Sequence, residues 1–425
     1  MITRVQIRGY KSLDDFRVDL GPIAVIVGPN ASGKSNVLDA LQLLAGFVTE
    51  GTLARAFETP HRGKILESCT YGPEGLEGLR NSPGVNLRFE VDVKLSRIVI
   101  ENVKARCEAL RKPHDETSTD EKTSKNREWI HEQHLRYVLE VRVDTKTAGL
   151  SVVDESLTPL KSDRQPKSSL SRKPFISRER GKLHLRMEGQ AHPRYLDIGL
   201  DHTVVSTELY APHYPHVVAF REELSRWRFY YFEPKRLMRA ETPIADVKYV
   251  DSSGGRLAAF YHALAANNPR QFKAITAALR SFIPQIQDIR TEVDKVGNVE
   301  LTVLENGVPY SGRLISEGTL RMLGIFAAVN APHAPTLIGY EEPENGIHPE
   351  RISLVADLFK NQAELRGFQL IVNTHSPTFP ECFKANERFR CERVDGRTDW
   401  TPLSKLGPLF EESAIRQSLA DSSLS

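Results

Sequence analysis

Cysteine is scarce in this 425-residue sequence, and long apolar runs are missing. The four cysteines form no CxxC pair, which argues against a zinc site and against a disulfide framework. No apolar stretch approaches the roughly 20 residues that cross a bilayer. The opening MITRVQIRGYKSL lacks the apolar core of a signal peptide. We therefore expect a cytoplasmic protein with no membrane-spanning segment.

An excess of charge of one sign is also missing. The sequence has 57 Lys and Arg against 55 Asp and Glu, for a net charge of +2. This balance argues against a uniformly basic protein that coats DNA, so any nucleic-acid surface would have to be a local patch. Sustained heptads are absent, which disfavours a long coiled coil. The length allows two or three structural units, or one core with a large insertion.

A glycine-rich loop lies between a predicted strand and a predicted helix in residues 23–48. The run IAVIV is uniformly apolar, as in a strand buried on both faces, and apolar residues recur at helical spacing after the loop. The intervening GPNASGKS matches G-x-x-x-x-G-K-S, a phosphate-binding loop whose backbone N–H groups wrap phosphates. Lys34 would reach the β- and γ-phosphates, and the Ser35 hydroxyl would bind Mg²⁺. The candidate nucleotide-binding residues are Gly28, Pro29, Asn30, Ala31, Ser32, Gly33, Lys34, Ser35 and Asn36.

A second apolar run, in TLIGYEEPENGIHP (336–349), ends in three carboxylates. Glu341 and Glu342 are adjacent, and Glu344 follows two residues later. The plain interpretation is an acidic surface loop. The alternative is a magnesium site with a catalytic base, in which Glu341 and Glu342 take separate roles where the strand ends. The phosphate-binding loop favours the alternative. A helix is predicted to start near Pro349.

Two further segments place polar residues at the ends of apolar elements. In RLISEGTLRMLGIFAAV (313–329), Ser316 is a plausible helix N-cap, and a helix start that carries Ser and Gly can bind phosphate. In FQLIVNTHSP (368–377), a buried strand ends in Thr374, His375 and Ser376. Groups at the carboxyl ends of strands are those that an open α/β sheet presents to its ligand.

Taken in order, GPNASGKS, SEGT, YEEPENGIHP and NTHSP resemble the ABC-type ATPases of the SMC/RecF/Rad50/OLD group. The resemblance is closest to compact bacterial AAA-labelled (AAA15/AAA_21-like) ATPases without a Toprim domain, and it covers about residues 1–60 and 220–380. It implies an α/β fold: an ABC-type P-loop ATPase core, with a mixed sheet flanked by helices. An inserted antiparallel β-rich region would complete the fold.

The resemblance also implies roles for residues. Glu342 would orient or deprotonate the attacking water, and His375 would sense the γ-phosphate. Ser35 and Glu341 would support Mg²⁺, with ATP as the nucleotide. The family usually has Asp where this chain has Glu341, so the longer side chain predicts shifted metal coordination and slower turnover. The residues expected to contact the ATP of a second subunit are Ser316, Glu317, Gly318 and Thr319.

Four parts are predicted along the chain. They are an ATPase lobe at 1–84, an inserted β-rich charged region at 85–215, the rest of the ATPase core at 216–380, and a short extension at 381–425. Two short antiparallel strands, with alternating apolar residues from Thr3 to Leu20, would flank the phosphate-loop strand.

The predicted insertion has three notable segments. Residues 85–93 and 135–143 alternate as half-exposed strands do. The segment 111–134 between them is highly charged, and its His131 and His134 lack the spacing of a metal motif. The segment 160–182 is rich in Lys and Arg, so it is either a solvated loop or a contact to a phosphate backbone.

Three functions compete at this stage. The first is an ATPase that forms a homodimer or higher oligomer around ATP and regulates a DNA-related or antiphage defence complex, with DNA or RNA as a partner. The effector, a nuclease or Toprim-type protein, would then be a separate chain, because residues 378–425 leave no room for such a domain. The second is the nucleotide-binding subunit of a membrane transporter. The third is a slow ATP-dependent switch or scaffold with little turnover.

Overall fold

The computed structural model describes residues 1–58, 62–111, 128–161, 163–167, 173–188 and 194–405. The chain forms two compact units. The first consists of Met1–Gly21, Ala31–Trp227 and Glu392–Trp400, and the second of Pro22–Asn30, Arg228–Cys391 and Thr401–Ser425. Apart from Pro22–Asn30, the predicted parts 1–84 and 85–215 both fall in the first unit. Among the described residues, no helix has the length and apolarity needed to cross a bilayer.

The first unit is built on an eight-stranded sheet with the order β2-β1-β4-β5-β6-β7-β8-β9. Neighbouring strands are antiparallel throughout. Alternate residues of β4 are buried, as the alternation in the sequence predicts. The strands are β1 (Ile2–Arg8), β2 (Phe16–Asp19), β4 (Val85–Lys94), β5 (His134–Val143), β6 (Leu150–Pro159), β7 (Ile176–Glu179), β8 (Lys182–Leu185) and β9 (Arg194–Asp197).

Helices α1 and α6 pack on this sheet. The ring of Phe47 in α1 lies 5.9 Å from that of Phe89 in β4, and Phe220 in α6 lies 4.8 Å from Tyr137 in β5. Because Phe89 and Tyr137 are on the same face of the paired strands, α1 and α6 cover one face of the sheet. The helices of this unit are α1 (Lys34–Thr49), α2 (Arg55–Glu58), α3 (Gly75–Arg80), α4 (Arg97–Arg111) and α6 (Pro215–Leu224).

A buried carboxylate joins the sheet to the segment before α6. Glu155 in β6 accepts hydrogen bonds from the backbone N–H groups of Val204 and Val205 at 2.7 and 3.1 Å, and from the Tyr137 hydroxyl at 2.9 Å. Burial raises the pKa of Glu155 to about 7, although the two backbone N–H groups oppose this shift. The side chain therefore titrates within the ordinary working range of pH.

The second unit contains the parallel strands of a six-stranded sheet with the order β10-β15-β16-β3-β17-β18. Strands β15, β16, β3 and β17 run parallel to one another. Every residue of β15 and β16 is buried, as expected for strands covered on both faces. The strands are β3 (Ile23–Val27), β10 (Trp227–Tyr230), β15 (Leu337–Glu341), β16 (Gln369–Thr374), β17 (Arg388–Val394) and β18 (Arg397–Pro402).

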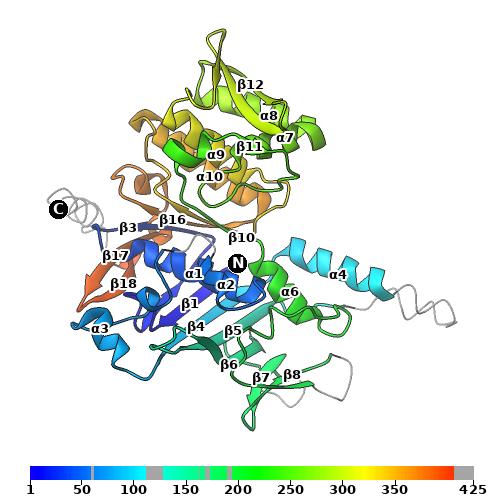
Figure 1. Ribbon diagram of the computed structural model, residues 1–425, viewed down its shortest axis with the longest axis vertical. Coiled ribbons are helices and arrows are strands. Elements are labelled where there is room, and N and C mark those ends of the chain that lie inside the picture. Colours follow the sequence, from blue (N-terminus) through cyan, green and yellow to red (C-terminus); the bar gives the residue numbers. More distant parts are fainter. Residues whose placement is uncertain (59–61, 112–127, 162, 168–172, 189–193, 406–425) are drawn as a thin grey trace. The chain divides into compact units, whose positions relative to one another are not determined.

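A four-stranded antiparallel sheet completes the second unit, and Figure 1 shows α8 beside its strand β12. One apolar core runs from this sheet through α7, α9 and α10 to β15 and β16. The elements are β11 (Thr242–Pro243), α7 (Leu257–Asn267), α8 (Pro269–Phe282), β12 (Ile286–Val293), β13 (Asn298–Glu305), β14 (Val308–Ser311), α9 (Glu317–Val329) and α10 (Ile352–Arg366).

One local expectation requires correction, one helix was not anticipated, and two predicted segments lie partly outside the described residues. Strands β1 and β2 do pair, but they join β4 and do not flank β3, because their alternating pattern suits a half-exposed sheet. Helix α4 was not anticipated, although Val99, Val103 and Cys107 form a buried stripe along it. Most of the charged segment 111–134 lies outside the described residues, as do residues 406–425 of the predicted C-terminal extension.

The titration of Glu155 should appear in the pH dependence of stability. A folded-state pKa of about 7, raised from 4.5, means that the folded protein holds this proton more tightly than the unfolded chain. The free energy of unfolding of the wild type should therefore fall as pH rises from 4.5 to 7, by at most about 1.4 kcal/mol per pH unit from this group. Glu155→Gln cannot titrate and should lack this fall.

The measurement is urea unfolding at half-unit pH steps, with Glu179→Gln, an exposed carboxylate, as the control. Parallel pH profiles for the wild type and Glu155→Gln would contradict the prediction.

Candidate functional site

The carboxyl ends of three parallel strands meet at one edge of the six-stranded sheet. Gly28 follows the last residue of β3, Glu341 is the last residue of β15, and His375 follows the last residue of β16. Pairing places Glu341 beside Asn373, and Thr374 beside Val27. The structure therefore brings the start of the predicted phosphate loop to the same edge as the predicted catalytic residues.

The backbone of the phosphate loop is shaped by close neighbours. A Cβ at Gly28 would collide with the carbonyl oxygen of Cys391 in β17, and a Cβ at Gly33 would collide with the Thr398 hydroxyl. Gly33 is also the N-cap of α1 and has φ +97°, a conformation that favours glycine. Lys34 and Ser35 are the first two residues of α1, and Lys34 is buried. A loop in this form can direct backbone N–H groups of the helix start toward a phosphate.

Two residues that the motif did not indicate support this loop. The hydroxyls of Ser12 and Thr398 lie 2.6 Å apart, and Thr398 donates to the carbonyl of Ser32 at 2.9 Å. Asn36 donates from its side chain to Ser12 at 2.7 Å, so this predicted nucleotide-binding residue bonds to the support of the loop. Ser12 and Thr398 are 386 positions apart, and no local pattern could have paired them.

Glu342 and His375 contact each other directly. Glu342 Oε1 lies 3.2 Å from His375 Nε2, and each side chain is 31% exposed. Asn345 donates from its side chain to the second oxygen of Glu342. The backbone N–H of Glu342 donates to the backbone and side-chain oxygens of Asn373, at 3.0 and 3.2 Å. Glu342 has φ +49°, which is strained for a non-glycine residue and turns the chain away from the strand direction.

Glu341 differs from its neighbour because it is buried, with 7% of its surface exposed. A buried carboxylate requires an opposite charge, hydrogen-bond donors or a metal. Mg²⁺ prefers oxygen ligands such as carboxylates and hydroxyls, so Glu341 and Ser35 are chemically suited to that ion.

The SEGT segment begins α9 as predicted. Ser316 is the N-cap: its hydroxyl accepts from the backbone N–H of Thr319 at 3.2 Å and lies 2.9 Å from the Thr319 hydroxyl. Glu317 lies 3.8 Å from Lys235. A Cβ at Gly318 would come within 2.5 Å of the carbonyl oxygen of Gly346, so this segment packs against the Pro-Glu-Asn-Gly turn of its own chain.

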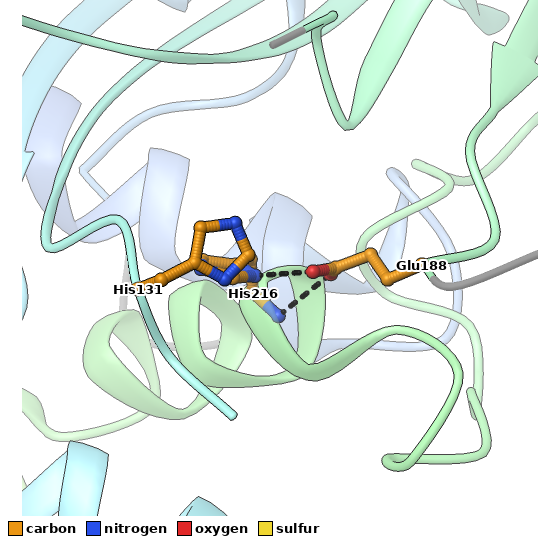
Figure 2. Close-up of side chains that lie close together, drawn as sticks. All are labelled: His131, Glu188 and His216. Carbon is orange, nitrogen blue, oxygen red and sulfur yellow. Dashed lines mark hydrogen bonds and ion pairs between the residues drawn. The ribbon is translucent and has the colours of Figure 1, made fainter. Parts of the chain in front are cut away.

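A separate group of side chains in the first unit consists of residue types that can bind a metal ion. Figure 2 shows His131, Glu188 and His216 close together, and their ligand atoms lie within 4.8 Å of one another. The sequence contains no metal motif at His131, and Glu188 and His216 are not among the predicted site residues. His216 is fully buried between other rings, with Phe175 stacked at 4.3 Å.

The hydrogen bonds of His216 identify this group as a helix cap. Its Nε2 accepts from the backbone N–H of Glu132 at 3.0 Å, so the proton is on Nδ1, which donates to Glu188 at 2.6 Å. A metal on Nδ1 would move the proton to Nε2, where it would face the Glu132 N–H. Glu188 also accepts from the backbone N–H of His216 at 3.2 Å, in the first turn of α6. A carboxylate at a helix start satisfies open N–H groups and the helix dipole.

The basic segment 160–182 is partly neutralised. Arg164 lies 2.9 Å from Asp19, Lys167 2.7 Å from Glu132, and Lys182 3.0 Å from Asp197. Residues 162 and 168–172 lie outside the described residues. A phosphate backbone would have to compete with these three carboxylates.

Two family models match separate parts of the chain. Residues 1–133 match the family described as "AAA ATPase domain", and residues 228–379 match "AAA domain, putative AbiEii toxin, Type IV TA system". The matched segments contain the glycine loop and the Glu341–His375 region, respectively. They agree with the family resemblance, because each segment is similar to an AAA-type ATPase domain.

Solved structures confirm the fold. A structure titled "SmcHead bound to the C-winged helix domain of ScpA" is 13% identical, covers 96% of this chain and 99% of that one, and has a TM-score of 0.55. A second Smc head domain, from Pyrococcus furiosus, is 11% identical with a TM-score of 0.50, over 97% and 99% of the two chains. The fold is thus that of an SMC-head-like ABC ATPase with mixed and antiparallel sheets.

A curated relative, the OLD nuclease of Thermus scotoductus, is 38% identical over 60 residues. These residues are 14% of this chain and 11% of the relative. The similarity is therefore local and distant.

Lys34→Ala should abolish ATP binding, because the β- and γ-phosphates lose the cation that the loop motif supplies. Fluorescent-ATP titration measures this loss. Lys64→Ala, in the first unit but outside the loop, is the matched control and should bind as the wild type does. Undiminished binding by Lys34→Ala would exclude the loop as the nucleotide site.

Glu188→Ala should lower the free energy of unfolding by about 1–3 kcal/mol, because the backbone N–H and the Nδ1–H of His216 lose their acceptor. Treatment with EDTA, or addition of Zn²⁺, should leave the melting temperature of the wild type unchanged. Glu208→Ala, an exposed glutamate, is the control. If Zn²⁺ stabilised the wild type but not His131→Ala, the group would be a metal site instead.

Proposed function

We propose that this chain binds and hydrolyses ATP as a homodimer and thereby regulates a DNA-related or antiphage defence complex with a separate effector. The observation that carries the proposal is the pair of Glu342 and His375, 3.2 Å apart, at the sheet edge where the glycine loop begins. A carboxylate and an imidazole at the edge where a phosphate-binding loop begins suit phosphoryl transfer to water, in which one group positions the water and others stabilise the phosphate charge.

Each residue of the site has a distinct task in this mechanism. The loop and Lys34 hold the phosphates by backbone N–H groups and charge. Glu342 orients the attacking water and accepts its proton, and His375 both contacts the γ-phosphate and restrains Glu342. Glu342 has a strained backbone and a partly exposed carboxylate, whereas Glu341 is buried. The reaction is then driven by positioning and charge neutralisation.

Mg²⁺, when bound, neutralises phosphate charge in reactions of this class. Ser35 and Glu341 would hold it. Glu341 is one methylene longer than the aspartate usual in the family, so we expect slower turnover than in relatives with aspartate. A slow switch with little turnover is the second candidate, and this substitution favours it.

The biological setting and the partners that we propose are based on the family match and the curated relative. The family name "putative AbiEii toxin, Type IV TA system" and the local similarity to an OLD nuclease support a defence setting. We infer that ATP joins two copies of the chain, with residues Ser316–Thr319 of each facing the ATP of the other. A nuclease or Toprim-type effector would then be a separate protein, with DNA or RNA as a further partner.

Glu342→Gln should bind ATP with wild-type affinity and hydrolyse it about 10²–10⁴-fold more slowly, because the amide cannot accept the proton of water. Phosphate release measures hydrolysis, and light scattering measures the mass of the ATP complex. With hydrolysis blocked, the dimer should accumulate in ATP. Ser316→Arg should bind ATP but remain monomeric.

Glu350→Gln, on an exposed residue of the same region, should hydrolyse ATP and dimerise as the wild type does. Equal hydrolysis by Glu342→Gln and the wild type would remove Glu342 from its role. A Glu342→Gln protein that stays monomeric in ATP would refute the shared-site dimer.

A further inference from the structure

Glu344 holds the segment that carries His375. A single oxygen of Glu344, Oε1, accepts from the Thr374 hydroxyl at 2.7 Å and from the backbone N–H groups of His375 and Ser376 at 2.9 and 3.1 Å. Three donors on one carboxylate oxygen restrict the backbone on both sides of His375. Glu344 lies in the turn after β15, so this contact joins two of the loops at the sheet edge.

The other oxygen of Glu344, Oε2, is buried and makes no hydrogen bond within the described part of the chain. Among the described residues, Glu344 Oε2, Arg321 Nε and the Tyr340 hydroxyl are buried without a hydrogen-bond partner. Tyr340 lies in β15, Glu344 lies in the turn after this strand, and Arg321 in α9 has its Nε 3.8 Å from the position of a Cβ at Gly346 in the same turn. Two buried groups that can donate, on β15 and α9, and one buried acceptor in the turn after β15 thus have no hydrogen-bond partner in the ranges that the structure describes. A buried polar atom without a partner costs about 1–3 kcal/mol.

Arg321 connects this group to the SEGT segment. It lies in α9 three residues after Gly318, and therefore on the same side of the helix. Its Nε would be 3.8 Å from a Cβ at Gly346, and the Gly346 carbonyl in turn lies against Gly318. A small movement at the start of α9 would therefore displace Arg321 and the turn that carries Glu344.

We propose that Glu344 is a positioning residue that transmits the state of α9 to His375 through Arg321. This inference rests on the proposed function, in which the SEGT segment of one subunit faces the ATP of the other. Binding there shifts α9, and Arg321 reaches Glu344 Oε2 and satisfies both buried groups. The doubly held carboxylate then fixes Thr374, His375 and Ser376. ATP in one site thereby completes the neighbouring site.

Two substitutions separate the two halves of this contact. Glu344→Gln can keep its carbonyl oxygen toward His375 while its amide nitrogen replaces Oε2, so it retains the first contact and loses the acceptor for Arg321. Arg321→Met keeps the apolar length of the side chain and loses the charge. The matched controls are Glu350→Gln and Arg270→Met, at exposed positions of the same unit.

The first readout is amide hydrogen exchange at His375 and Ser376, whose N–H groups contact Glu344. In the Glu342→Gln background, ATP should slow exchange at these two amides. Arg321→Met and Glu344→Gln should each abolish this slowing while still binding ATP, and the controls should retain it. Full slowing in both Arg321→Met and Glu344→Gln would overturn the proposal.

The second readout is the dependence of hydrolysis on ATP concentration, measured with Glu342 intact. The wild type should be cooperative, and the Hill coefficient should fall to about 1 in Arg321→Met and in Glu344→Gln. A wild-type Hill coefficient of 1, or unchanged cooperativity in both variants, would overturn the relay while hydrolysis itself still supported the proposed function. A wild type that hydrolyses no ATP would refute the proposed function instead.

Discussion

The parallel pairing of β15, β16 and β3 is the constraint on which the candidate site depends. Parallel strands end at the same edge of a sheet, and here three consecutive neighbours end in a glycine loop, a pair of glutamates and a histidine. These residues are far apart in the sequence, so only the order of the strands brings them together. The full burial of β15 and β16 makes any slip of register costly, because each strand is covered on both faces.

The loops at this edge are then shaped by residues outside the motifs. The carbonyl of Cys391 and the hydroxyl of Thr398 occupy the space that side chains at Gly28 and Gly33 would need. Asn373 receives the N–H of Glu342 and supports its strained backbone. The motif residues supply the chemistry, whereas neighbouring strands supply the geometry.

Much of this arrangement could be predicted, because it depends on local patterns. The apolar strands, the helix after the glycine loop and the N-cap at Ser316 each have a short-range signal. The supports Ser12 and Thr398, the three contacts of Glu344 and the cap formed by Glu188 do not. They join residues whose proximity depends on the folded sheet, and their side chains are common in loops for other reasons. The placement of β1 and β2 was wrong for the same reason, since alternation predicts a strand but does not identify its partner.

Glu188 and Glu344 show how carboxylates that both hold another segment of the chain can behave differently. At Glu188 both oxygens have donors and the histidine tautomer is determined, so the group is complete and stabilises one helix start. At Glu344 one oxygen accepts from three donors, while the other is buried without a hydrogen-bond partner among the residues described. A complete network favours a single state, whereas an incomplete one leaves free energy to be gained by a small movement. Glu344 contacts the segment of His375 and Arg321 lies in α9, so such a movement would connect the two nucleotide sites of the proposed dimer.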